Sequence, residues 1–192
     1  VRRWRESGYR GASPVTRELF AWWAREDASR RLFFCQREAV ETLVYLLELA
    51  LPDRLGASGF RTFEIAADDV RRLLAGERPS FHVSEDEFFP RLVDPPLDRA
   101  LLALPRLGCK MATGSGKTVV MSMIITWAFA NRGRNPQSTW FPNAVLICAP
   151  NLTVKERLQI LRPEHPQNYY DDFELVPPKY RELLNGGKVL VT

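Results

Sequence analysis

The sequence lacks the long apolar segments of membrane and secreted proteins. Its longest nearly unbroken apolar run, residues 119–130, covers 12 positions, well short of the roughly 20 that a membrane-spanning helix needs. Residues 1–10 carry four arginines among two aromatic side chains and contain no apolar stretch of the signal-peptide kind. We therefore expect a cytoplasmic protein with no membrane partner.

Cysteine and histidine are scarce and scattered. The three cysteines, Cys35, Cys109 and Cys148, are odd in number and include no Cys-x-x-Cys pair, which argues against a disulfide framework or a zinc site. The two histidines, His82 and His165, have no cysteine or second histidine at ligand spacing. We expect reduced, buried thiols and no metal ion held by these residues.

Charge is balanced overall but unevenly distributed. The 192 residues carry 27 basic and 23 acidic side chains and are 45% hydrophobic, as in ordinary globular proteins. Residues 1–31 have a net charge of +4, residues 32–100 of −5 and residues 101–192 of +5. The basic ends could favour a polyanion, although an arginine-rich solvated surface would give the same counts.

Apolar spacing in the first half predicts helices over residues 16–23 and 32–51, and a short helix over 66–74. Residues 80–96 are acidic, aromatic and interrupted by proline, which is typical of a loop or inserted segment.

The second half alternates predicted strands and helices. In chain order these are a strand at 107–111, a turn at 112–116, a helix at 117–131, a strand at 144–149, a helix capped by Thr153 and ending near 161, a proline-bearing loop, a short helix at 180–184 and a strand at 188–192. Continuous rather than alternating apolar strands favour a parallel α/β sheet. Because the sequence begins at Val1 and ends in a strand, we expect it to be a fragment of a longer protein.

The most informative stretch is Met111-Ala-Thr-Gly-Ser-Gly-Lys-Thr118. Gly114 and Gly116 let the backbone curl so that consecutive N–H groups converge into an anion nest, at the positive end of the following helix. Lys117 would supply a cation to the β- and γ-phosphates, and the Thr118 hydroxyl would be a ligand to Mg²⁺. The residues expected to contact ATP in this loop are Thr113, Gly114, Ser115, Gly116, Lys117 and Thr118, with Lys117 and Thr118 also expected to serve catalysis.

This segment resembles motif I of superfamily 2 helicases, where Ala or Met commonly replaces the first Gly of the general pattern, as Met111 does here. Upstream, residues 33–39 resemble the glutamine-bearing segment of that superfamily, which implies that Gln36 reads adenine. A side-chain amide can donate to and accept from the N6 and N7 edge of adenine. The alternative is an ordinary glutamine on a helix surface.

Downstream, residues 145–158 resemble motif Ia, which touches the nucleic-acid backbone in these enzymes. The resemblance gives Pro150, Asn151, Thr153 and Lys155 as nucleic-acid-binding residues. Short polar groups at a helix N-terminus favour phosphate, and Lys155 and Arg157 add positive charge. An ordinary helix cap is the alternative for each of the polar residues.

The closer resemblance is to the helicase and translocase (Res) subunit of type III restriction enzymes and its DEAD/DEAH-box relatives. Four segments carry it: residues 109–118, 152–158, 168–173 and 188–192. It implies, over 32–192, the first part of a RecA-like P-loop NTPase motor domain with an insertion at about 52–103. Residues 1–31, basic and with helical spacing, are expected to form a basic helical arm in front of that domain. The resemblance also implies ATP and Mg²⁺ as cofactors, and as partners the backbone of double-stranded DNA and a methyltransferase subunit.

One required element is missing from the printed sequence. Superfamily 2 enzymes need a second motif, Asp-Glu-x-Asp or Asp-Glu-x-His, to hold Mg²⁺ and position water, but the only Asp-Glu pair, Asp86-Glu87, precedes the glycine-rich loop. We expect this motif and any nuclease domain to lie outside the chain, so that the chain binds ATP weakly and hydrolyses it poorly or not at all. A helicase of DNA repair or RNA metabolism, a non-catalytic nucleotide-binding remnant, and a kinase or transporter ATPase are the alternatives.

Overall fold

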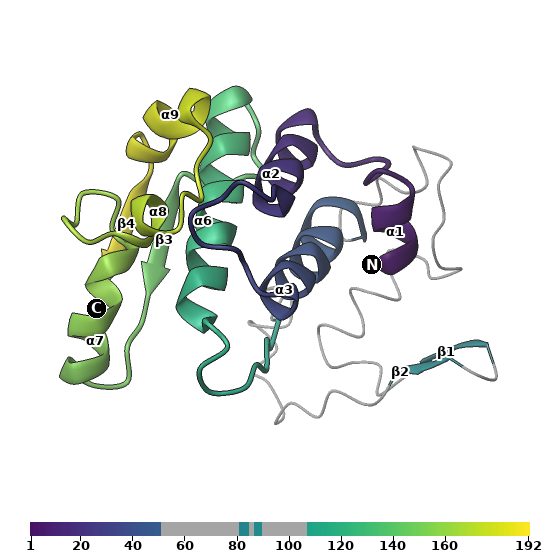
Figure 1. The fold of residues 1–192 in the computed structure, drawn as a ribbon, viewed down its shortest axis with the longest axis horizontal. Coiled ribbons are helices and arrows are strands. Elements are labelled where there is room, and N and C mark those ends of the chain that lie inside the picture. The colour runs from purple at the N-terminus through teal and green to yellow at the C-terminus, as the bar shows by residue number, and fades with distance from the viewer. Residues whose placement is uncertain (51–80, 85–86, 90–106) are drawn as a thin grey trace. The chain divides into compact units, whose positions relative to one another are not determined.

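The computed structural model describes residues 1–50, 81–84, 87–89 and 107–192, and mixes helices with short strands (Figure 1). The chain forms two compact units. One comprises residues 1–12 and 42–110, and the other comprises residues 13–41 and 111–192. The division into an arm over 1–31 and a motor domain over 32–192 follows different boundaries and stays a prediction. No helix in the described ranges is long and apolar enough to cross a membrane.

The three cysteines, Cys35, Cys109 and Cys148, are all exposed. The expectation that their thiols are buried is therefore wrong: the segments that carry them do not turn these positions toward a core.

The first unit is organised around Trp4 on helix α1 (Arg2–Glu6), which is completely buried. Its ring meets those of Tyr9 and Tyr45 edge-on, at 5.1 and 5.3 Å between centroids, and its Nε1 donates to the Arg10 carbonyl at 3.0 Å. Tyr45 begins a π-helical segment, η1 (Tyr45–Ala50), which continues α3 (Phe34–Val44). The helix predicted over 32–51 is therefore confirmed, with a change of winding at Tyr45.

The same unit contains a short antiparallel hairpin, β1 (Phe81–Ser84) with β2 (Glu87–Phe89). The expectation of a loop over 80–96 is wrong for these residues. Phe81 pairs with Phe89 and His82 with Phe88, and aromatic residues favour strands over loops. The helix predicted over 66–74 lies outside the described residues.

The second unit is built on α6 (Lys117–Arg134), which is buried along most of its length. Helices α2 (Pro14–Ala24), α8 (Tyr169–Asp172) and α9 (Arg181–Asn185) pack against it (Figure 1). The helices predicted over 16–23, 117–131 and 180–184 are thus confirmed. A proline-bearing loop was expected around α8, but Asn168 starts a helix there by accepting the Asp171 N–H with its side chain at 2.9 Å.

A buried polar cluster joins α2 to α6. Thr16, fully buried, accepts hydrogen bonds from Trp127 Nε1 at 3.0 Å and from Asn131 Nδ2 at 3.2 Å. The Ser13 hydroxyl lies 3.0 Å from that of Thr16 and 2.6 Å from Asn131 Oδ1. Since buried polar groups need partners, these bonds fix the position of α2 along α6.

Strands β3 (Ala144–Ile147) and β4 (Lys188–Val191) form a parallel pair, which confirms the strands predicted at 144–149 and 188–192. Ile147 and Val189 are buried on one face, whereas Leu146 and Leu190 are exposed on the other. The strand predicted at 107–111 is wrong: in the described part of the chain β3 and β4 pair only with each other. Residues 108–110 are exposed, so the segment has no buried face of the kind that holds a strand in a parallel sheet.

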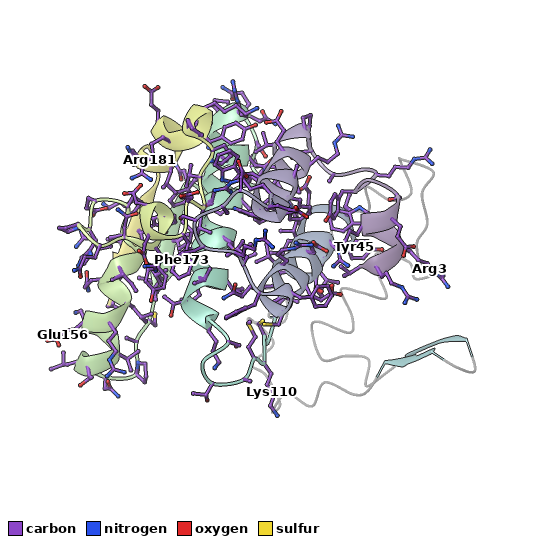
Figure 2. The ribbon with its side chains drawn as sticks, in the orientation of Figure 1. Arg3, Tyr45, Lys110, Glu156, Phe173 and Arg181 are labelled. Atoms are coloured by element: carbon purple, nitrogen blue, oxygen red, sulfur yellow. The ribbon has the colours of Figure 1, made fainter. Side chains whose placement is uncertain are left out.

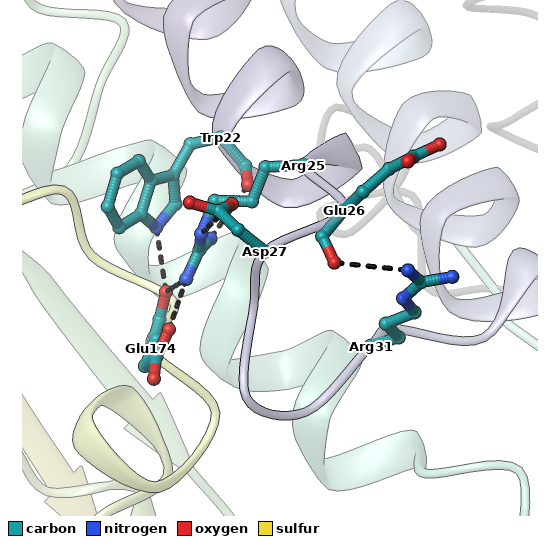
Figure 3. Close-up of polar contacts among 6 residues, drawn as sticks. All are labelled: Trp22, Arg25, Glu26, Asp27, Arg31 and Glu174. Atoms are coloured by element: carbon teal, nitrogen blue, oxygen red, sulfur yellow. Dashed lines mark hydrogen bonds and ion pairs between the residues drawn. The ribbon is translucent and has the colours of Figure 1, made fainter.

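The connection from α2 to α3 is anchored at Glu174 (Figure 3). Arg25 stacks 3.8 Å from the centre of the Trp22 ring and pairs with the Glu174 carboxylate at 2.6 Å, while Trp22 Nε1 donates to the Glu174 carbonyl at 2.7 Å. Farther along the connection, Arg31 donates to the Glu26 carbonyl at 3.2 Å. These contacts fix the segment that leads into the first turn of α3.

Candidate phosphate-binding loop

The glycine-rich loop, residues 111–118, runs directly into the first turn of α6. Gly114 and Gly116 both have φ of 79°, and Gly116 is the left-handed N-cap of α6. Side chains with a Cβ rarely adopt this conformation. The two glycines singled out from the sequence therefore stand where the backbone requires them.

Several N–H groups of the loop have no acceptor among the described residues. They belong to Gly114, Gly116, Lys117 and Thr118. The loop is exposed over residues 112–114 and at Lys117. Unpaired donors at the start of an 18-residue helix suit a bound anion.

Lys117 and Ser115 turn their side-chain donors toward one point, the Ala112 carbonyl. Lys117 Nζ lies 2.8 Å from that oxygen and Ser115 Oγ lies 2.7 Å from it. The ammonium group of Lys117 is thus held over the loop by a single neutral acceptor and forms no ion pair with a described carboxylate. Sequence reasoning did not single out Ala112, whose contribution is a backbone oxygen.

The donor set of the loop fits a phosphate chain, since it combines unpaired N–H groups with one ammonium. A metal ion has fewer ligands here. No group of three or more His, Cys, Asp or Glu that could hold a metal occurs in the described ranges. The Thr118 hydroxyl has no partner among these residues, so Mg²⁺ would rest on Thr118 and on phosphate oxygens.

Gln36 lies against this loop. Its side chain, 3% exposed, accepts from the Phe33 N–H at 2.8 Å and donates from Nε2 to the Ser115 carbonyl at 3.1 Å. The structure thus brings together the glutamine and the glycine-rich loop, 79 residues apart in the chain. Phe33 and Phe34, which the sequence analysis did not single out, are more than half exposed at the start of α3.

The residues predicted to contact nucleic acid lie just before and within the first turn of α7 (Leu152–Leu158), after β3. The predicted cap, Thr153, is wrong: the N-cap is Asn151, whose Oδ1 accepts the Val154 N–H at 2.9 Å. An Asx-type cap forms there because Asn151 has extended backbone dihedrals and Thr153 is already helical. Pro150, Asn151 and Thr153 are exposed and Lys155 is half-buried.

No residue of α7 is buried. Glu156 extends outward from the helix (Figure 2), and Arg157 is exposed as well. The helix therefore presents a mixed, largely solvated surface.

Two shifted pKa values belong to a contact between α2 and η4 (Pro178–Tyr180). A hydrogen bond from Lys179, followed by one from Tyr180, lowers the pKa of Glu18 below its usual 4.5. Burial, aided by the bond to Glu18, raises the pKa of Tyr180 to about 12. Glu18 is therefore ionised and Tyr180 neutral at physiological pH, which suits a structural contact.

Comparisons with known proteins found no match to this chain among protein-family models, characterised proteins or solved structures.

Proposed function

We propose that residues 111–118 bind the triphosphate of ATP together with Mg²⁺. The observation that carries the proposal is the set of N–H groups at Gly114, Gly116, Lys117 and Thr118 that lack acceptors in the described chain, next to the Lys117 ammonium. Anions bind where such donors converge at a helix N-terminus.

Each residue has a definite task in this proposal. The glycine backbone curves around the phosphates, and the Lys117 ammonium leaves the Ala112 carbonyl to meet the negative charge. The Thr118 hydroxyl would hold Mg²⁺, which supplies charge neutralisation of the phosphate oxygens. Thr113 and Ser115 complete the loop.

We further propose that the chain is the ATP-binding part of a RecA-like motor domain in a DNA helicase or translocase similar to the type III restriction Res subunit. The sequence order of the glutamine segment, the glycine-rich loop and the motif Ia segment supports it. The parallel pairing of β3 and β4, separated by α7, α8 and α9 along the chain, is compatible with such a fold. A helicase of repair or RNA metabolism and a non-catalytic nucleotide-binding module stay as alternatives.

DNA contact is assigned to the start of α7. Pro150, Asn151 and Thr153 are exposed there, and Lys155 adds a positive charge at the end of the first turn of α7. Asn151 uses Oδ1 for the cap, which leaves its Nδ2 as a donor to a phosphate oxygen. Recognition of double-stranded DNA and of a methyltransferase subunit follows from the resemblance alone.

Hydrolysis by this chain should be slow or absent. No Asp-Glu pair follows Lys117 in the printed sequence, and phosphoryl transfer to water needs a carboxylate that holds Mg²⁺ and orients the attacking water. Binding is therefore the property to measure.

The direct test is isothermal titration of Mg²⁺-ATP into the wild-type chain and Lys117→Ala. Loss of a charge-assisted hydrogen bond is worth about 1.5–3 kcal/mol, so affinity should fall by about 10- to 150-fold. The unfolding temperature should stay nearly the same, because the exposed Lys117 side chain contacts only a backbone oxygen.

Lys188→Ala is the matched control, since Lys188 is also exposed and carries the same charge. It should bind ATP as the wild type does. Equal affinity in Lys117→Ala and wild type would refute the assignment of the loop.

A further inference from the structure

The two ends of the Gln36 amide hold two different backbone segments. Oε1 accepts the Phe33 N–H at 2.8 Å, which closes the turn that starts α3, and Nε2 donates to the Ser115 carbonyl at 3.1 Å. The side chain is 3% exposed. An amide engaged in this way fastens α3 to the glycine-rich loop.

The bond to Ser115 determines where the next N–H points. The Ser115 carbonyl and the Gly116 N–H belong to one planar trans peptide unit, so they face opposite ways. Because Gln36 holds the carbonyl on its own side, the Gly116 N–H is directed away from Gln36. That N–H has no acceptor among the described residues. It is therefore available to a ligand.

Gly116 shows how closely the Gln36 side chain and the glycine-rich loop fit together. A Cβ added there would overlap the Gln36 Nε2 atom, and the next contacts are Gln36 Cδ at 3.3 Å and a Val119 methyl at 3.6 Å. The same position has φ of 79°. Both the backbone conformation and the space occupied by Gln36 thus require glycine at the N-cap of α6.

We propose that Gln36 is a positioning residue for the phosphate loop, and that it raises affinity for any triphosphate chain whatever base is attached. This inference rests on the proposed function of the loop. It differs from the sequence-based expectation that Gln36 reads adenine, because each end of the amide already holds a backbone partner and the side chain is only 3% exposed, which leaves little of it open to a base. The contribution of Gln36 is therefore made through the Ser115–Gly116 peptide.

Inorganic tripolyphosphate with Mg²⁺ separates positioning of the loop from reading of adenine, since it carries phosphates and no base. Its affinity, and those of Mg²⁺-ATP and Mg²⁺-GTP, would be titrated for wild type, Gln36→Met and Gln36→Glu. Methionine keeps the length of the side chain without hydrogen bonds. Glutamate keeps an oxygen that can accept the Phe33 N–H. It replaces Nε2 by a second oxygen, which would face the Ser115 carbonyl with no hydrogen to donate.

Gln36→Met should lower the affinity for all three probes by a similar factor of about three to ten, the range set by one lost hydrogen bond. Gln36→Glu should lower all three by at least as much. Cys35→Ala, an exposed neighbour without a charge, is the control and should change none of them. Unfolding temperatures recorded alongside identify any variant that is not folded.

Loss of affinity for ATP alone would overturn the proposal in favour of base reading, and unchanged affinity for all three would also overturn it. A wild-type chain that binds none of the probes would refute the proposed function itself and this inference with it. One wild-type measurement needs no folded variant: the Gln36 side-chain amide resonances should respond alike to tripolyphosphate and ATP. A response to ATP only would contradict the positioning role.

Discussion

Replacing Thr16 by valine tests how α6, the helix that follows the phosphate loop, is held in place. Valine has nearly the shape of threonine but lacks the hydroxyl that accepts hydrogen bonds from Trp127 Nε1 and Asn131 Nδ2. Thr16, Trp127 and Asn131 are all at least 96% buried, so water cannot replace the lost acceptor without a rearrangement of α2.

The magnitude follows from the groups left behind. Trp127 Nε1 would lose its acceptor, which costs about 1–3 kcal/mol for a buried donor. Asn131 Nδ2 keeps a second bond to the Trp127 carbonyl at 2.9 Å, so its loss is smaller, about 0.5–1 kcal/mol. We expect Thr16→Val to lower the free energy of unfolding by about 1.5–4 kcal/mol.

Urea denaturation followed by tryptophan fluorescence and circular dichroism would measure this difference. Thr16→Ser keeps the hydroxyl and removes one buried methyl group, so it should cost only about 1 kcal/mol. ATP affinity of the folded protein should not change, because Asn131 lies 14 residues, or about 20 Å, along α6 from Lys117. A cost below about 0.5 kcal/mol for Thr16→Val, or an equal cost for Thr16→Ser, would refute the reasoning.

Two further predictions concern the packing of α6 and its neighbours. Glu18→Gln should reduce the loss of stability on acidification, because the folded-state pKa of Glu18 lies below its usual 4.5. The contribution of the Glu18 carboxylate to stability is present above pH 4.5 and is lost as the pH falls through the folded-state pKa. Thermal unfolding recorded between about pH 5 and pH 2 measures this, and the same pH dependence in the variant and the wild type would contradict it. Gly187→Ala should destabilise the protein by about 1–3 kcal/mol, because the new methyl group would overlap the buried Phe129 ring. Gly186→Ala, whose Cβ would meet nothing closer than 3.6 Å, is the control, and equal unfolding midpoints for both variants would count against the packing.

Most helices and both parallel strands were predictable because their signals are local. The apolar spacing of α2 and α6 and the continuous apolar runs of β3 and β4 each lie within a single segment. The strand expected before the loop failed because strand formation depends on a partner, and residues 108–110 are exposed. Hydrophobic character alone does not supply that partner.

The candidate site was predictable in part for the same reason. The positions of Gly114, Gly116 and Lys117 could be read from a contiguous motif, whereas the bond from Gln36 to the Ser115 carbonyl joins residues 79 positions apart. A resemblance suggested a role for Gln36 at the base, and only the folded backbone places its amide against the loop. Likewise, Asn151 rather than Thr153 caps α7 because the backbone turns at Asn151.

The N–H groups of the glycine-rich loop are the proposed phosphate ligands, and backbone amide resonances report on them directly. In ¹⁵N-labelled protein, saturating Mg²⁺-ATP should shift the amide signals of Gly114, Gly116, Lys117 and Thr118 more than any others and slow their hydrogen exchange. If these four signals stay in place while ATP shifts residues elsewhere, or shifts none, the loop does not hold the triphosphate.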